Sequence, residues 1–438
     1  MAADTDKSLR TQVMYQIFPR NFSSEGTFNA IIPQLDRIKE LGTDIIWLTP
    51  IHPVGEKNRK GSLGSPYAIK DYRAVNPEFG TEDDLRRLVS EIHSRGIKCI
   101  IDVVYNHTSP DSVLAAEHPE WFWHTSDGSI GPRVTEWSDV ADLDYSNRDL
   151  WDYQIDTLKM WAGIVDGFRC DVAPLVPLEF WKRAREEVKS IRPDAIWLCE
   201  SVEPRFITYM RSRGLTALSD SELYQAFDIS YDYDIFDEFE AYFKGTGTLK
   251  DYAGSVNRQE YIYPDNYVKL RFLENHDRPR AASYIKTPTG LRNATAFVFF
   301  QKGLTLLYAG QEVAASHLPS LFDKDDVNWD SRDNVDLSGL MRRMAQIKKL
   351  PVFADSSYHV EAISEDVIAC IHTQNGGSGK FIGLFSFAGE PCKIKIPHDQ
   401  ENETIADGIY TDLISETEIT VSQGCINFIG EPVIISIP

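Results

Sequence analysis

Three acidic residues each stand near the end of a short apolar run, where a carboxyl group can do chemistry. The runs are GFRCDV with Asp171, AIWLCES with Glu200 and LRFLENHD with Asp277. The carboxyl ends of the strands of a parallel barrel meet at one mouth, so three such groups could surround one substrate atom. Cleavage of a glycosidic bond uses a pair of carboxyl groups in this way.

The neighbours of the first two acids favour opposite protonation states. Strand alternation puts Arg169 and Asp171 on one side, and a guanidinium keeps a nearby carboxylate ionised, as a nucleophile toward a sugar carbon must be. Glu200 follows an apolar run, where loss of water and nearby acids raise the pKa of a carboxyl, as a general acid requires. Taken singly, Asp171 could instead form a structural ion pair with Arg169, and Glu200 could instead be an exposed acid at a strand end.

Other polar residues are expected near the acids. Asn275 and His276 precede Asp277 and could hydrogen-bond sugar hydroxyls; the alternative for this acid is a solvated loop position. In SPYAIKDY, Tyr67 could stack on a sugar ring while Asp71 bonds to its neighbours. An anchor for the loop core is the alternative for Tyr67.

The run DVVYNH gives a further polar strand end. Asp102 and Asn106 share one side of the strand, and His107 begins a long connection. Asn106 could be an oxygen ligand for Ca²⁺ or could satisfy loop backbone. No HExxH, P-loop or EF-hand pattern occurs, so the sequence predicts no other metal or phosphate site.

The elements that position these residues alternate between strand-like and helix-like runs over the first 350 residues. In TEDDLRRLVSEIHSRG, for example, Thr81 can cap a helix and Gly96 can end it. Eight strand–helix units favour an α/β fold of the (β/α)8 TIM barrel type over an open Rossmann-type sheet, whose GxGxxG turn is missing. The predicted strands are 13–19, 44–50, 98–106, 167–172, 195–201, 226–233, 267–275 and 304–312.

Two further segments are predicted beside the barrel. Residues 108–144 are rich in Trp, His, Pro and Gly, and a connection of that length after the third strand indicates a short inserted domain B over the mouth. Short alternating runs, with NGGSG as a hairpin turn, predict an antiparallel C-terminal β-sandwich, domain C, over 351–438. The catalytic barrel, domain A, then comprises 1–107 and 145–350.

Composition narrows the function classes. The chain has 438 residues, 42% of them hydrophobic, and a net charge of −21, which argues against nucleic acid as a partner. The charge fits a neutral or cationic ligand, although it also serves solubility alone. Scattered cysteines without CxxC spacing indicate a reducing compartment. No signal-peptide core and no apolar run of about 20 residues occur, so a soluble, cytoplasmic protein without a membrane partner is expected.

Taken together, these motifs resemble the α-amylase family of glycoside hydrolases, family 13, over most of the chain. YQIFPRNF is similar to the family's first strand, SPYAIKDY with NPEFGT to its second loop, and DVVYNH to its first signature region. GFRCDVA, LCES and FLENHD resemble the nucleophile, acid and third-acid regions, and VADLDYSN resembles a short motif near the end of domain B. The order and spacing of these motifs make the resemblance specific.

The resemblance implies a retaining double displacement. Asp171 would form a covalent glycosyl-enzyme, Glu200 would act as general acid and then base, and Asp277 would stabilise the transition state. Asp102 would be a structural partner of the site. The subsite of the cleaved ring would be lined by Tyr67, His107, Arg169 and His276.

The implied substrate is a neutral α-glucan, either a malto-oligosaccharide, glycogen or starch, cleaved at α-1,4 bonds without a cofactor for the chemistry. Ala173, Pro174 and Leu175 stand where many family members carry Lys-His, and the inserted segment is short. Both departures argue against the family's usual calcium site and leave Asn106 without evident partners, so a structural calcium ion is an open alternative.

The activities of other members of the family are alternative predictions of the function. The DVA that starts at Asp171 resembles the neopullulanase and cyclomaltodextrinase branch, and an exo-acting α-glucosidase or a transglycosylase would share the chemistry up to the covalent intermediate. A non-catalytic sugar-binding relative is disfavoured because it would not need all three acids and Arg169.

Overall fold

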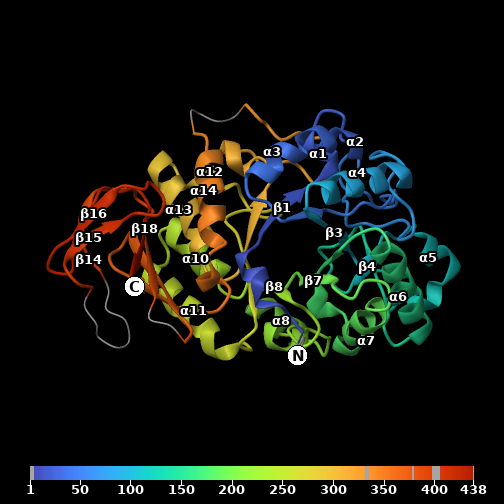
Figure 1. Cartoon of the computed structure of the whole chain (residues 1–438). Coiled ribbons are helices and arrows are strands. Elements are labelled where there is room, and N and C mark those ends of the chain that lie inside the picture. Colours follow the sequence, from blue (N-terminus) through green and yellow to red (C-terminus); the bar gives the residue numbers. More distant parts are fainter. Residues whose placement is uncertain (1–3, 331–334, 377–378, 397–404, 438) are drawn as a thin grey trace.

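Eight parallel strands close into a barrel in the order β1-β10-β9-β8-β7-β6-β3-β2, which confirms the predicted (β/α)8 fold (Figure 1). The computed structural model describes residues 4–330, 335–376, 379–396 and 405–437. The barrel strands are β1 (Val13–Ile17), β2 (Ile45–Leu48), β3 (Lys98–Val103), β6 (Gly167–Cys170), β7 (Ile196–Cys199), β8 (Ile229–Tyr231), β9 (Val268–Arg271) and β10 (Leu304–Tyr308).

Each barrel strand is shorter than its predicted run. The run 98–106 contains β3, which ends at Val103, and the run 267–275 contains β9, which ends at Arg271. The difference arises because the residues after a strand stay buried in the loops of the barrel mouth, as Leu273 does. An apolar run therefore marks burial, and it does not mark where the ladder of hydrogen bonds stops.

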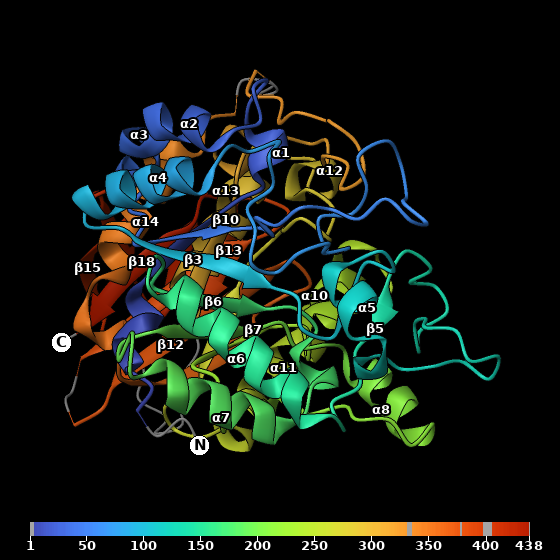
Figure 2. The ribbon, with the colours of Figure 1, turned by 90° about the vertical axis from the view of Figure 1, so that its right-hand side faces the viewer.

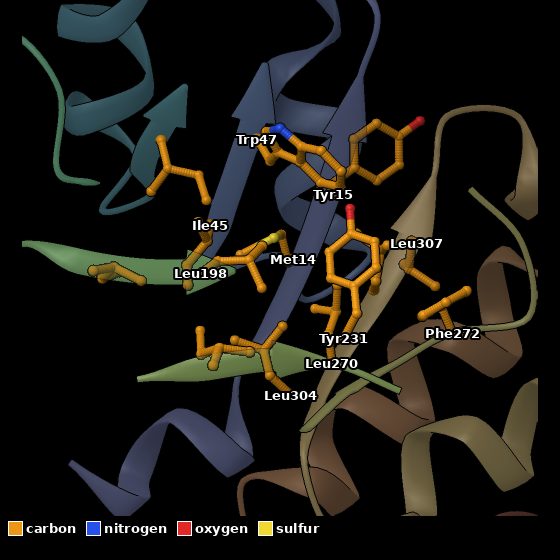
Figure 3. Packing of buried hydrophobic residues seen from close by; sticks show 14 of the residues in the cluster. Met14, Tyr15, Ile45, Trp47, Leu198, Tyr231, Leu270, Phe272, Leu304 and Leu307 are labelled. Atoms are coloured by element: carbon orange, nitrogen blue, oxygen red, sulfur yellow. The ribbon is translucent and has the colours of Figure 1, made fainter. Parts of the chain in front are cut away.

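Apolar side chains fill the barrel interior, as expected for this fold (Figure 3). Met14, Ile45, Leu198 and Leu304 are among the buried side chains that pack there. The aromatic rings of Trp47 and Tyr231 meet edge to face with centroids 6.3 Å apart. The guanidinium of Arg169 lies over both rings, 5.3 Å and 5.4 Å from their centroids, so the polar site begins directly above this core.

Helices follow the barrel strands and cover the outside of the barrel (Figures 1 and 2). The long ones are α4 (Glu82–Ser94), α6 (Arg148–Ala162), α7 (Leu178–Val188), α8 (Pro204–Ser212), α10 (Phe236–Phe243), α11 (Leu249–Ile262), α13 (Pro288–Phe300) and α14 (Ser338–Lys348). The short ones are α1 (Pro19–Phe22), α2 (Phe28–Ile31), α3 (Leu35–Glu40), α5 (Val113–Glu117), α9 (Asp220–Leu223) and α12 (Ala281–Tyr284).

The helix α4 begins and ends as the sequence predicts. Thr81 and Asp84 form a reciprocal capping box at its first turn. Leu85, Leu88 and Ile92 are buried on one face. Gly96 follows the helix in the left-handed region with φ +66°.

The inserted segment begins and ends beside the barrel mouth. Its first strand, β4 (His107–Thr108), pairs antiparallel with its last strand, β5 (Ala141–Asp142). Figures 1 and 2 show α5 and these strands on the opposite side of the barrel from the C-terminal sheets. A small apolar cluster joins Val134 of the segment to Ile207 and Met210 of α8. The assignment of 108–144 as a separate domain stays a prediction.

The C-terminal region is antiparallel, as predicted. Its main sheet has the order β11-β12-β13-β18, and two strand pairs, β14 with β17 and β15 with β16, lie beside it. The sheet packs against α11 and α13 of the barrel (Figure 1). The strands are β11 (Ser356–Ala362), β12 (Val367–Gln374), β13 (Lys380–Ser386), β14 (Cys392–Lys395), β15 (Gly408–Thr411), β16 (Glu418–Val421), β17 (Cys425–Phe428) and β18 (Val433–Ile437).

The alternating runs that predicted this region are DVIACIHT, KFIGLFSF, CKIKIP, EITVS and PVIISIP, and three strands, β11, β15 and β17, lie outside them. The residues of β15 are mostly exposed and lack an apolar alternation, which explains the omission. Part of the predicted NGGSG turn, residues 377–378, lies outside the described residues.

Two further expectations concern the cysteines and membrane spans. Cys99, Cys170 and Cys199 are buried within barrel strands as free thiols. Among the described residues, no helix combines the length and the apolar character that crossing a bilayer requires.

Candidate active site

The carboxyl ends of the barrel strands surround a cavity of about 230 Å³. Asp171 directly follows β6, Glu200 directly follows β7, and Asp277 lies in the loop after β9. All three acids line this cavity together with Tyr67 and His107. Five of the residues predicted from sequence are therefore brought together around one space.

Arg169 connects three carboxyl groups beneath the cavity. Strand pairing sets Asp102 of β3 directly beside Arg169 of β6. Nη1 of Arg169 donates to Oδ1 of Asp102 and to Oδ1 of Asp171, each at 2.8 Å, and Nη2 forms an ion pair with Oε2 of Glu200 at 3.0 Å. Burial opposes the charge of Arg169, but the carboxylates of Asp102 and Glu200 outweigh it and raise the pKa of the guanidinium. Arg169 is therefore a fixed cation that holds the acids in place.

Glu200 is in an environment that keeps a proton on its carboxyl group. Its residue is 8% exposed, and burial raises the pKa of this carboxyl well above its ordinary value. Arg169 works against this rise, and the nearby carboxylates of Asp171 and Asp277 add to it. A carboxyl with a raised pKa can donate a proton near neutral pH.

The backbone turns sharply between the first two acids. Val172 has φ +33° and ψ 44°, a left-handed conformation that β-branched residues rarely adopt. This conformation accompanies a hydrogen bond from the N–H of Val172 to Oε2 of Glu200, 2.8 Å long. Strained residues of this kind concentrate at functional sites. Nothing in the sequence around Val172 indicated this backbone conformation.

His276 and Tyr67 form a stacked pair at the side of the cavity. Their ring centroids lie 5.4 Å apart at an interplanar angle of 18°. Nε2 of His276 lies 2.5 Å from Oη of Tyr67 and 3.0 Å from Oδ2 of Asp277. Oη of Tyr67 also donates to Oδ2 of Asp102 at 3.1 Å. Burial lowers the pKa of His276 to about 4, so its imidazole is neutral at physiological pH.

The remaining predicted residues differ in their distance from the cavity. Oδ1 of Asn275 accepts from the backbone N–H of Asp277 at 2.9 Å, which fixes the loop of the third acid. Nε2 of His107 lies 3.9 Å from Oδ2 of Asp171. Asp71 is not among the residues that line the cavity. Its carboxylate instead accepts from the backbone N–H of Arg73 in a local turn.

Comparison with known proteins assigns the chain to a family. The model of the α-amylase catalytic domain matches residues 16–127 and 117–346, and the model of the bacterial α-amylase C-terminal domain matches 359–435. The chain belongs to the α-amylase family of glycoside hydrolases. The first match covers well over half of the chain and contains all three acids.

Solved α-amylase structures superpose on nearly the whole chain. An α-amylase from Lactobacillus plantarum is 44% identical with a TM-score of 0.93, over 99% of this chain and 100% of that one. A noncanonic maltogenic α-amylase, AmyB from Thermotoga neapolitana, is 31% identical with a TM-score of 0.86, over 98% and 99%. The fold and the family assignment thus agree.

Curated relatives are more distant and longer. The α-amylase MalA of Haloarcula japonica is 27% identical over 94% of this chain. The chain spans 60% of the length of that relative and 64% of the next. Several α-1,4-glucan:maltose-1-phosphate maltosyltransferases match less than half of this chain. The α-amylase family to which the chain belongs therefore includes hydrolases and transglycosylases.

Asn106 is poorly suited to hold a calcium ion in this family member. It lines a second cavity of about 290 Å³ with Arg133 and Asp142, and its Nδ2 lies 3.1 Å from Nδ1 of His107. Nη1 of Arg133 is 3.6 Å from one oxygen of Asp142, whose other oxygen is buried without a hydrogen-bond partner. Ca²⁺ takes about six to eight oxygen ligands. Asp144 also lines this cavity, and its Oδ1 accepts from the backbone N–H of Ser146. Two carboxylates and one amide beside a guanidinium do not fit that requirement.

Among the residues that the structure describes, no group of three or more His, Cys, Asp or Glu lies in a position to hold a metal ion.

Several residues of this α-amylase-family site were missed by the sequence reasoning. Trp137 and Asp139 of the inserted segment, Lys60 of the loop after β2 and Phe322 of the segment after β10 line the cavity with the acids. The Trp-rich composition of 108–144 was a signal for Trp137. Lys60 and Phe322 come from ordinary polar loops, so only the three-dimensional structure brings them to the site.

Proposed function

We propose that this α-amylase-family chain hydrolyses α-1,4-glucosidic bonds of malto-oligosaccharides, glycogen or starch with retention of configuration. The observation that carries the proposal is the contact of one buried guanidinium, Arg169, with both Asp171 and Glu200 at the wall of a single cavity. Retaining glycosidases need a nucleophile and an acid held close together on the same substrate.

In the first step, Glu200 gives its proton to the glycosidic oxygen while a carboxylate oxygen of Asp171 attacks the anomeric carbon. The bond to the leaving sugar breaks, and a covalent glycosyl-enzyme forms on Asp171. In the second step, ionised Glu200 takes a proton from water, whose oxygen attacks the same carbon and frees the carboxylate of Asp171. The raised pKa of Glu200 supports its role as the acid.

The neighbours of these acids hold the ring during both steps. Asp277 accepts hydrogen bonds from sugar hydroxyls and stabilises the positive charge that develops on the ring. Tyr67 stacks on the ring, and neutral His276 and the adjacent His107 bind its hydroxyls. Asp102 positions the site through its contacts with Arg169 and Tyr67. No cofactor takes part in these steps.

Transglycosylation is the second candidate, and it differs only in the acceptor of the second step. The partly exposed ring of Trp137 lines the cavity and could hold an acceptor sugar in place of water. The family contains maltosyltransferases, which also supports this candidate. Measuring the ratio of transfer products to hydrolysis products at high maltotriose concentration separates the two.

We further propose that the substrate is a cytoplasmic glucan. The cysteines buried as free thiols in barrel strands support a reducing compartment. The net charge of −21 suits a neutral glucan better than nucleic acid.

Product analysis tests the proposed function. Maltoheptaose cleaved by the chain is expected to give shorter maltodextrins whose new reducing ends are first released as the α-anomer, followed over time by NMR. Release of the β-anomer first would exclude the retaining mechanism. Absence of cleavage of any α-glucan would exclude the proposed activity.

A further inference from the structure

The loop after β2, residues 55–64, is bonded at one end to the inserted segment. Nδ2 of Asn58 donates to the carbonyl of Ser138 at 3.3 Å. Nζ of Lys60 lies 2.7 Å from Oδ1 of Asp139, whose side chain is 7% exposed. This ion pair joins the loop after β2 to the segment that follows β3.

The same loop is bonded at its other end to the segment after β10. The N–H and Oγ of Ser62 donate to Oδ1 of Asp323 at 2.8 Å and 2.7 Å. The N–H of Leu63 donates to the carbonyl of Phe322 at 2.9 Å. At Gly61, φ is +63° and a Cβ would come within 2.6 Å of Cβ of Phe322, so the approach of the two segments requires glycine.

These contacts make one continuous wall, defined here as residues 58–64 together with 138–139 and 321–323. Lys60, Asp139 and Phe322 of the wall line the catalytic cavity. In the barrel order, β10, β1, β2 and β3 are consecutive, and the wall spans the mouth above them. The acids follow β6, β7 and β9 on the remaining half.

Aromatic rings outside the wall also reach the cavity. Trp137, which lines the cavity with Glu200, and Phe206 of α8 have ring centroids 6.3 Å apart. Tyr209, the next aromatic residue along α8, is 51% exposed, and its ring centroid lies 6.5 Å from that of Phe206. These aromatic rings continue from the cavity toward solvent, and such rings can stack on successive sugars of a chain.

The proposed roles of the acids orient a glucan between the wall and these aromatic rings. The general acid protonates the oxygen of the leaving sugar, so the leaving part of the chain lies beside Glu200 and the aromatic rings. The ring that becomes attached to Asp171 then lies toward Tyr67 and the wall. That ring belongs to the non-reducing part of the chain.

We propose that the wall closes the non-reducing side of the site, so that the chain acts from the non-reducing ends of α-glucans and releases only short units. This inference rests on the proposed function, since it uses the roles of Glu200 and Asp171. The cavity of about 230 Å³ is smaller than the range of about 300–1,000 Å³ in which drug-sized ligands bind. The closure itself is carried by the contacts of the wall, which join the loop after β2 to the segments after β3 and β10 at the cavity lining.

The direct test compares two substrates, maltoheptaose with a free non-reducing end and the same oligosaccharide with that end blocked by a 4,6-O-ethylidene group. The blocked substrate is expected to be cleaved on the order of 100-fold more slowly, because its end cannot be seated against the wall. Equal rates on the two substrates would overturn the inference while leaving the proposed hydrolysis intact. If neither substrate is cleaved, the proposed function itself fails.

Variants of the wall sharpen the test. Lys60→Ala removes the ion pair with Asp139, and we expect it to raise the rate on the blocked substrate relative to the rate on the free substrate about tenfold. Lys57→Ala is the matched control. Lys57 is an exposed lysine of the same loop outside the cavity lining, so its substitution is expected to leave that ratio of rates unchanged. Asp139→Asn serves as a second variant at the other end of the pair. If Lys60→Ala and Asp139→Asn both fold, as judged by their melting temperatures, and both keep the wild-type ratio, the wall does not restrict the substrate.

Discussion

The half of the barrel mouth above β6, β7 and β9 and the half above β10, β2 and β3 hold their functional groups by different means. In the first half, Arg169 is completely buried and joins carboxyl groups that directly follow strands. In the second half, Lys60 and Asp139 meet between two loops, and the side chain of Lys60 is 37% exposed. In the proposed mechanism, the chemistry is therefore carried by residues at strand ends, whereas the proposed limit on substrate length is carried by surface loops.

The largest expected effect is the loss of the nucleophile from the first half. Asp171→Asn is expected to lower kcat on maltoheptaose on the order of 10⁴-fold or more, because an amide cannot form the glycosyl-enzyme. Asp71→Asn is the matched control, since Asp71 lies outside the cavity lining, and near wild-type kcat is expected. Steady-state kinetics of both variants checks this; substantial activity in Asp171→Asn would remove Asp171 from the mechanism.

Substitutions in the two halves should also lower the free energy of unfolding by different amounts. Arg169→Met leaves buried carboxyl groups without their cation and is expected to lower the free energy of unfolding by about 3–5 kcal/mol. Lys60→Ala breaks a pair with one partly exposed partner, for which about 0–1 kcal/mol is expected. Urea unfolding of both variants measures the difference. Equal losses would mean that the two halves are not held differently.

The titration of Glu200, in the first half, is expected to make both stability and kcat/KM depend on pH. Its pKa is higher in the folded chain than the value of about 4.3 in an unfolded one. Its contribution to stability is therefore complete below that lower value and is lost as pH rises through the folded value. The same loss of the proton should lower kcat/KM at alkaline pH.

Glu200→Gln isolates this effect. We expect it to lower kcat/KM by about 10²–10⁴-fold and to remove the alkaline fall of the pH profile, because glutamine does not titrate. The alkaline fall in stability should become smaller in the same variant. An alkaline limb of kcat/KM that is unchanged in Glu200→Gln would assign the titration to another group.

The smallest expected effect concerns metal. Treatment with EDTA is expected to leave the melting temperature and the rate unchanged, because Asn106, Asp142 and Asp144 offer too few oxygen ligands beside Arg133. A fall in melting temperature that added Ca²⁺ restores would show that this part of the mouth does bind the ion.

How much the sequence could predict also differs between the two halves. Asp171 and Glu200 were found because each directly follows a buried strand, and strand ends of a parallel barrel meet whatever the loops do. Lys60 and Phe322 could not be found, because their meeting depends on loop hydrogen bonds between segments far apart in the chain. Asp71 was expected to bond to its neighbours as a supporting residue, and it accepts from the backbone N–H of Arg73 but does not line the cavity.

Trapping the covalent intermediate tests the central claim most directly. Glu200→Gln incubated with α-glucosyl fluoride should complete the first step, because fluoride leaves without a proton, and should stall at the second, because no base activates water. Mass spectrometry is expected to find one added glucosyl group on the peptide that contains Asp171. Fluoride release with the glucosyl group on another residue, or with no labelled peptide at all, would contradict the account.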